Sequence, residues 1–357
     1  MPVSPDTESW LQLTLVPGAS DDAVRRLLVA HGAPDAVLRA SAAQLRETVN
    51  APTAAALKEG APADRIVAAL RWLADADNHL VTLADATYPP ALLQLPDAPP
   101  VLYVKGRVEL LRLPSIAVVG SRNATAQGAA TARSFAHALS DAGLVVVSGL
   151  ALGIDAAAHE GALEGRSSTV AVVGTGLDIV YPARNRDLAH RIARDGALVS
   201  EFPLGMPALA ANFPRRNRLI SGMARGCLVV EAAVSSGSLI TARLANEQGK
   251  DVFAIPGSIH SALSKGCHTL IKQGAKLVDN VQDILEELHL QSGPGIAPPG
   301  EREAHPLLAL MGYDPCDVDT LAALSGLAAA EVAALMTRFE LDGHVAGLPG
   351  GRYQRTR

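Results

Sequence analysis

The sequence has few cysteines, and their placement excludes the common metal-binding patterns. Only 3 of the 357 residues are cysteine, at positions 227, 267 and 316. This spacing contains neither a Cys-x-x-Cys pair nor a Cys/His arrangement that could hold zinc. We therefore expect reduced thiols and no metal site.

Long hydrophobic runs are also lacking. Even the apolar stretch 144–154 is interrupted by Ser148, Gly149 and Gly153, and it stays short of the roughly 18 residues that a membrane span requires. Residues 1–10 show no basic segment followed by an apolar one, as a secretory signal would. The sequence thus predicts a cytoplasmic protein with no membrane partner.

Two familiar phosphate-binding fingerprints are absent as well. No predicted strand leads into a G-x-G-x-x-G segment, and there is no G-x-x-x-x-G-K-[ST] loop. Residues 174–176, Gly-Thr-Gly, are followed by Leu177 and Asp178, so the third glycine is missing. The G-x-S-x-G nucleophile elbow is absent too. These absences disfavour a dinucleotide or ATP, and we expect no cofactor.

The chain is long and apolar enough for several folded domains. Its 357 residues, 48% of them hydrophobic, predict two or three domains with their own cores. Residues 1–78 have apolar positions at helical spacing, which predicts a helical module, with either plain connections or helix-hairpin-helix (SAM-like) turns. The proline-rich residues 79–112 are interpreted as an extended connector that opens a domain at 79–290. A Pro/Gly linker at 291–304 then leads to residues 305–357, whose helical patterns and final hairpin predict a winged-helix domain.

The region between residues 114 and 288 has the pattern of an open parallel sheet. Six short runs of Val, Ile, Leu and Ala lack polar alternation, as strands buried on both faces do. They are residues 115–119, 144–147, 169–173, 197–200, 227–230 and 251–255. Because a helical stretch follows each run, the predicted fold class is α/β, with a doubly wound parallel sheet of extended Rossmann-like type.

Glycine, serine and arginine residues follow several of these predicted strands. The carboxyl ends of parallel strands meet at one sheet edge, where loops and helix N-termini converge on a ligand. Glycine permits close backbone approach, hydroxyls donate hydrogen bonds and helix N-termini attract anions, so phosphate is the expected ligand. One such loop could equally be a turn or a helix cap, but several together indicate a site. The candidate residues are Gly120, Ser121, Arg122, Ser148, Gly149, Gly153, Gly174, Ser236, Gly237 and Ser238.

An arginine-rich segment lies in the same region, although the formal net charge of the chain is −5. Binding depends on local patches rather than on the average. Residues 212–225 contain arginines and no acid, and a predicted helix opens with Phe213, Arg215, Arg216, Asn217 and Arg218. Arginine forks bind phosphate and an aromatic ring stacks on a base, which suits a single strand. The alternatives are a Phe213 in the core and a solvated arginine face.

Candidate catalytic residues have no evident partners. Asp155 and His159 share a helix face, where they could form a metal or acid/base pair, but a helix-capping Asp155 with a surface His159 is the simpler interpretation. Asp178, Glu201 and Glu231 stand near strand ends without a nucleophile beside them. We therefore predict no catalytic residue and no enzyme. The alternatives are a Rossmann-like nucleotide-processing enzyme, with Glu231 or Asp178 as acid/base, and a pure interaction scaffold.

Five segments carry a resemblance to a known family: residues 117–122, 147–159, 213–221, 231–241 and 251–257. Through them the chain closely resembles the DNA-processing protein A family, DprA/Smf, over essentially its whole length. The resemblance implies a homodimeric protein of natural transformation, competence and recombination. Such a protein coats and protects single-stranded DNA and helps to load RecA.

The resemblance also assigns residues. It implies DNA contacts from Gly120 to Arg122, from Ser148, Gly149 and Gly153, and from Arg215 to Arg218, and it adds Lys265. One departure is Gly266-Cys267-His268, where the family has Gly-x-Asn, so that an amide donor is lost. We expect sequence-independent binding. With about four phosphates neutralised, the log–log salt slope would be roughly −3, at about −0.7 per phosphate.

Overall fold

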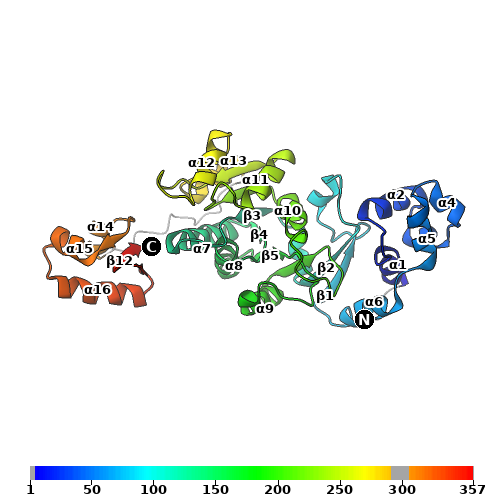
Figure 1. Ribbon diagram of the computed structural model, residues 1–357, viewed down its shortest axis with the longest axis horizontal. Coiled ribbons are helices and arrows are strands. Elements are labelled where there is room, and N and C mark those ends of the chain that lie inside the picture. The colour runs from blue at the N-terminus through cyan, green and yellow to red at the C-terminus, as the bar shows by residue number, and fades with distance from the viewer. Residues whose placement is uncertain (1–4, 291–304, 357) are drawn as a thin grey trace.

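The structure is a computed structural model that describes residues 5–290 and 305–356. Figure 1 shows an elongated molecule, with N-terminal helices at one end, an α/β domain in the middle and a small C-terminal domain at the other end. The linker expected at residues 291–304 lies outside the described residues.

The N-terminal helices pack around an apolar cluster of their own, which includes Leu13, Leu27, Leu45 and Leu57. Side chains at three helix starts accept a backbone hydrogen bond, as capping requires, so polar residues separate the short helices. The helices are α1 (Pro5–Thr14), α2 (Asp21–His31), α3 (Pro34–Arg39), α4 (Ala42–Arg46), α5 (Ala51–Glu59) and α6 (Ala63–Trp72).

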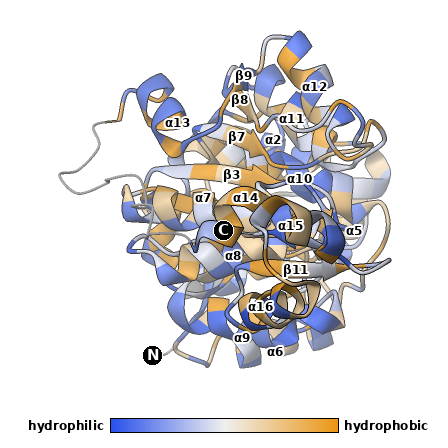
Figure 2. Ribbon diagram, turned by 90° about the vertical axis from the view of Figure 1, so that its left-hand side faces the viewer, coloured by the Kyte–Doolittle hydropathy of each residue, from blue (hydrophilic) through white to orange (hydrophobic). Residues whose placement is uncertain are grey.

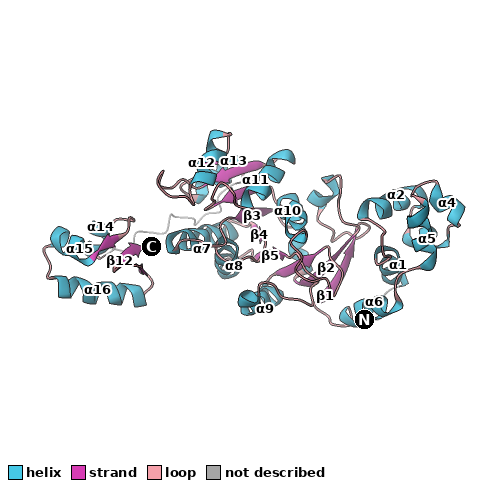
Figure 3. Cartoon of the chain, in the orientation of Figure 1, coloured by secondary structure: helices cyan, strands magenta, loops and turns pink. Residues whose placement is uncertain are grey.

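The middle domain is built on a sheet whose strands are magenta in Figure 3. It has nine strands, in the order β1-β2-β6-β5-β4-β3-β7-β8-β9. The six strands predicted from the sequence are present and pair in parallel. They are β3 (Ser115–Val119), β4 (Val145–Ser148), β5 (Thr169–Val172), β6 (Ala197–Ser200), β7 (Gly226–Val229) and β8 (Asp251–Ala254). A short strand, β9 (Lys276–Leu277), pairs in parallel with β8 at the edge. The doubly wound α/β fold is thus confirmed.

The prediction of an extended connector over residues 79–112 is wrong. This segment contributes β1 (Asn78–Thr82) and β2 (Val101–Gly106), which pair antiparallel with each other. Strand β2 also pairs antiparallel with β6, with Tyr103 opposite Ser200. The buried residues Leu102 and Val104 explain the difference, because they join the core of the sheet. The prolines that suggested a connector lie between the two strands.

Helices cover both faces of the sheet, and alternate residues of β3 show the division. Ile116 and Val118 pack with one helical layer, and Ala117 and Val119 pack with the other. Figure 2 shows β3 and β7 as hydrophobic strands between these layers. The first layer is α7 (Ala126–Asp141), α8 (Ile154–Glu164), α9 (Arg186–Asp195) and α13 (Val281–Glu287); the second is α10 (Asn212–Met223), α11 (Ser238–Glu247) and α12 (Lys265–Lys272).

The C-terminal domain is a winged helix, as predicted. Its core contains Leu321, Val332 and Met336. The elements are α14 (Pro306–Met311), β10 (Cys316–Asp317), α15 (Val318–Ser325), α16 (Ala329–Leu341), β11 (Val345–Leu348) and β12 (Arg352–Arg355). Within residues 5–290 and 305–356, no single helix is long and apolar enough to cross a membrane; α15 and α16 together pass on length and composition, with a bend of 112° between them.

Candidate nucleic-acid interface

An exposed arginine and two aromatic rings meet at the carboxyl edge of the sheet. Arg122 follows β3, and its guanidinium carbon lies 5.9 Å from the centroid of the Phe213 ring. The ring of Tyr181, from the loop after β5, lies 5.5 Å from the Phe213 ring, centroid to centroid. Arg122 is exposed, and in the described part of the chain its guanidinium has no ion pair. This arrangement offers a free cation beside an aromatic surface.

Glycines allow the loops at this edge to pack closely. A Cβ atom on Gly120 would lie 2.6 Å from the Ile154 side chain, and one on Gly153 would lie 2.3 Å from the Ser121 carbonyl oxygen. Gly153 also has a φ of 76°, which favours glycine. Gly174 gives room to Phe213, whose ring would be 3.1 Å from an added Cβ. Packing within the protein therefore requires glycine at positions 120 and 153, and favours it at position 174.

Arg216 is buried and forms part of the support of the edge. Its Nη1 donates to the carbonyl oxygens of Gly149, at 2.6 Å, and of Val172, which lie at the ends of β4 and β5. The absent side chain of Gly149 leaves space for this guanidinium. Burial lowers the pKa of Arg216 to about 10, and the Arg122 charge acts in the same direction. With 4% of its surface exposed, Arg216 is a structural residue, which corrects its predicted role as a phosphate contact.

The α10 arginines are not free of acids, as the sequence suggested. Arg218 pairs with Glu201, from the loop after β6, and with Asp97 at 3.0 Å. Arg215 pairs with the same Glu201 at 3.0 Å and with Asp21 of α2 at 2.5 Å. Burial of Glu201 outweighs its two arginine partners and raises its pKa to about 7. The prediction failed because these acids come from elements distant in sequence.

Side chains of β4 and α8 hold the loop that joins these two elements. The Ser148 hydroxyl is buried and donates to the Val118 carbonyl oxygen at 2.7 Å. Asp155 accepts from the amides of Gly149, at 3.1 Å, and Ala151, at 3.3 Å. Burial raises the pKa of Asp155. The Ser148 hydroxyl and the Gly149 amide are therefore used within the protein, which corrects their predicted role as phosphate donors.

His159 is buried rather than on the surface, so that prediction is wrong. Thr169 Oγ1 donates to the Val146 carbonyl oxygen and therefore accepts from His159 Nδ1 at 2.7 Å. The Leu150 amide donates to His159 Nε2 at 3.3 Å. Burial lowers the pKa of His159 to about 3. The neutral imidazole of His159 thus fixes the loop after β4. Helix α8 is buried because its small alanine side chains let neighbouring elements pack closely against it.

Glu231 occupies the crevice where the strand order reverses, between β3 and β7. Its carboxylate accepts from Thr125 Oγ1 at 2.6 Å and from the Thr125 amide at 3.0 Å, at the start of α7. Its carbonyl oxygen accepts from the Ser121 amide at 2.7 Å. This position is where Rossmann-like proteins bind a nucleotide phosphate. Here a carboxylate fills it, so Glu231 has a capping role in place of the acid/base role considered above.

The remaining predicted residues lie further along the edge. Ser236 and Gly237 precede α11 and Ser238 is its first residue; the Ser236 and Ser238 hydroxyls contact each other at 2.7 Å. Lys265 is exposed at the start of α12. His268 Nε2 lies 3.0 Å from the Gly257 carbonyl oxygen, so imidazole can supply the donor expected from asparagine.

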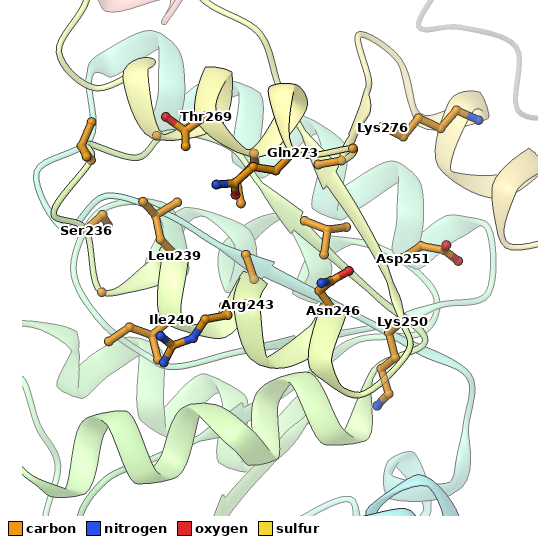
Figure 4. A pocket seen from close by; sticks show the side chains of 18 of the residues that line it. Ser236, Leu239, Ile240, Arg243, Asn246, Lys250, Asp251, Thr269, Gln273 and Lys276 are labelled. Atoms are coloured by element: carbon orange, nitrogen blue, oxygen red, sulfur yellow. The ribbon is translucent and has the colours of Figure 1, made fainter.

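A cavity of about 640 Å³ lies between α11 and α12, beside β8 rather than beside Arg122 (Figure 4). Ser236 and Gly237 line one end, and Arg243, Lys250 and Asp251 lie elsewhere on its wall. Within residues 5–290 and 305–356, no cluster of three His, Cys, Asp or Glu residues could hold a metal ion.

The fold and this edge define an α/β protein of the Rossmann-like class, with a cationic and aromatic surface and a winged-helix domain. Residues 79–289 match the family of DNA recombination-mediator protein A, and residues 292–351 match the DprA winged helix domain. The chain therefore belongs to the DNA recombination-mediator protein A (DprA) family.

Three relatives cover between 59% and 99% of the chain. Protein Smf of Escherichia coli K12 is 41% identical over 99% of this chain and 96% of its own length. The crystal structure of DNA processing protein A from Streptococcus pneumoniae is similar over 80% of this chain and 99% of its own, with 38% identity and a TM-score of 0.68. The Helicobacter pylori protein, studied for its single-stranded DNA binding mode, covers 59% of this chain and 96% of its own, with 31% identity and a TM-score of 0.54.

Proposed function

We propose that this protein binds single-stranded DNA without sequence specificity at the carboxyl edge of its parallel sheet. The observation that carries the proposal is the exposed, unpaired Arg122 guanidinium beside the Phe213 ring. A cation binds phosphate of any sequence, and a ring stacks on any base. The neighbouring switch-point crevice holds the Glu231 carboxylate, which disfavours a nucleotide-processing enzyme. We therefore propose a binding role without a chemical step.

Membership of the family supports the same ligand. The Helicobacter pylori relative is described as binding single-stranded DNA. In our proposal Arg122 makes the phosphate contact, Ser121 and Gly174 shape the edge, and Lys265 adds charge. Arg216 and Arg218 hold the edge in place from beneath.

The experiment is an anisotropy titration of a labelled dT oligomer against a duplex of equal length, at several salt concentrations. We expect tighter binding to the single strand and an affinity that falls with salt by about 0.7 log units per log unit for each neutralised phosphate. Equal affinity for both ligands would exclude the single-strand preference.

We further propose that the protein acts as a homodimer in recombination and natural transformation, protecting the bound strand and helping to load RecA. Family membership supports this role. Light scattering of the purified chain tests the dimer. A RecA filament assay on strands coated with a single-strand binding protein tests loading, and no acceleration of filament growth would contradict it.

A further inference from the structure

Tyr181 is an exposed aromatic residue that has no role in the function proposed so far. It has 49% of its surface exposed, yet it is not isolated, because its ring stands at 40° to the Phe213 ring with the centroids 5.5 Å apart. Scattered surface aromatics are common and need no function. A tyrosine that extends an aromatic surface already flanked by Arg122 is a different case.

Two exposed arginines follow Tyr181 within five residues. Arg184 lies in a short 3-10 helix, Ala183–Asn185, and Arg186 begins α9. Among the described residues neither guanidinium has an ion pair, whereas Arg194, at the other end of α9, pairs with Asp195 at 2.8 Å. Asp187 is near in sequence but forms no ion pair with either arginine in the described chain. Unpaired cations therefore accompany both rings: Arg122 lies beside the Phe213 ring, and Arg184 and Arg186 follow Tyr181 closely in the chain.

The segment that carries these side chains is fixed to the sheet edge. Asn185, which separates the two arginines, is buried and donates from Nδ2 to the carbonyl oxygens of Leu150, at 2.9 Å, and Ala151, at 3.1 Å. Those residues belong to the loop after β4. The arginines thus project from an anchored backbone, and less ordering is needed when a ligand binds.

We propose that Tyr181, Arg184 and Arg186 form a second DNA subsite, in which an unpaired base stacks on Tyr181 and the arginines bind flanking phosphates of the same strand. An aromatic ring accompanied by free cations is complementary to a single strand, whose base faces stack on a ring and whose backbone is anionic. A protein partner would instead need acidic and apolar groups in one fixed pattern. This inference rests on the proposed function and extends the site from Arg122 towards α9.

The test compares variants of the full-length protein in titrations of dT oligomers of increasing length and of one oligomer that carries 2-aminopurine. We expect Tyr181→Leu to weaken binding of long oligomers by about 5- to 100-fold, and to remove quenching of the 2-aminopurine that stacks on Tyr181. Tyr181→Phe keeps the ring and should retain both. Tyr313→Leu is the matched control, because Tyr313 is 51% exposed but lies in the winged-helix domain.

The arginines are tested through the salt dependence. The double variant Arg184→Ala/Arg186→Ala should make the log–log slope less negative by about 1.4, at about 0.7 per phosphate. Arg194→Ala removes one charge from the same helix and should leave the slope unchanged, since Arg194 is already paired. Unfolding midpoints of all variants confirm that they are folded.

The outcomes separate the two proposals. If the unmodified protein does not prefer single strands, or Arg122→Ala has no effect, the proposed function fails. If Arg122→Ala weakens binding while Tyr181→Leu and the double arginine variant do not, the second subsite is overturned and the proposed function stands. If Tyr181→Leu weakens duplex binding as much as it weakens single-strand binding, stacking of an unpaired base on Tyr181 is also overturned.

Discussion

Arginines near the carboxyl edge of the sheet fall into two groups that differ in their partners. The outer arginines, Arg122, Arg184 and Arg186, are exposed and form no ion pair within the described residues. The inner arginines, Arg216 and Arg218, have 4% and 8% of their surface exposed and are bound by carbonyl oxygens or carboxylates of the protein. The same residue type therefore holds the edge together in one group and is available for a ligand in the other.

The difference shows why a cluster of arginines in a sequence is an ambiguous sign of nucleic-acid binding. The free energy that the inner arginines can contribute is already used in folding, because their guanidinium groups satisfy strand ends and a buried Glu201. Only a cation without a protein partner can exchange its water for phosphate. Substitutions in the two groups should accordingly change different measured quantities.

The largest effect is expected for Arg216→Met. Removal of the buried guanidinium leaves the Gly149 and Val172 carbonyl oxygens without their donor and takes away the positive charge that lowers the pKa of the buried Asp155. The free energy of unfolding should fall by about 3–5 kcal/mol. Denaturant titration measures this change. Arg225→Met, at an exposed position just beyond α10, is the control and should stay within about 0.5 kcal/mol. Unchanged stability with lost DNA affinity would place Arg216 in the ligand site instead.

The next effect is a loss of stability in acid through His159. Because its pKa falls from 6.5 to about 3 on folding, the unfolded chain binds a proton that the folded chain does not. The stabilisation that the neutral His159 gives to the folded state is fully present above pH 6.5 and is lost as the pH falls. At pH 5 the free energy of unfolding should be about 2 kcal/mol lower than above pH 6.5. Unfolding titrations at pH 5 and pH 8 test this, and His159→Gln should show a smaller difference between them. An identical difference in both proteins would contradict the assignment.

A smaller effect is expected for Arg122→Ala, the test of the outer group. Loss of one charged contact to phosphate should weaken single-strand binding about tenfold, equally for all sequences, and make the salt slope less negative by about 0.7. The free energy of unfolding should change by less than about 0.5 kcal/mol. An affinity loss confined to one base composition would argue for base reading in its place.

The smallest effect is expected for Asp21→Asn, which should move Arg215 towards the outer group. The Asp21–Arg215 pair is partly exposed, so its loss should cost less than about 1 kcal/mol of stability. With one restraint removed from Arg215, DNA affinity should rise a few-fold and its salt slope should steepen, by at most about 0.7. Asp22→Asn, at the next position of the same helix, is the control. Weaker DNA binding by Asp21→Asn would contradict this view.

The sheet could be predicted from the sequence because buried parallel strands are continuous apolar runs, as at 115–119 and 227–230. Strands β1 and β2 were missed because prolines surround them and β1 is a half-buried edge strand. The loops at the carboxyl edge of the sheet were also predictable. The side chains that accept hydrogen bonds from the amides of these loops were not. Asp155 accepts from the Gly149 amide, which the sequence suggested was free, and His159 and Glu231 accept from the neighbouring donors of Leu150 and Thr125. Tyr181 was missed because its neighbour Phe213 lies more than thirty residues away in the chain.

The carboxylate of Glu231 is an anion from the chain itself, bound at the N-terminus of α7. In a nucleotide-dependent Rossmann protein the corresponding helix N-terminus binds a phosphate of the nucleotide, and its amides have no anionic partner until the nucleotide binds. Here the chain supplies the anion itself, so α7 is complete in the apo protein. A mononucleotide would have to displace a tethered competitor of the same charge, whereas a polymer can bind alongside it through Arg122.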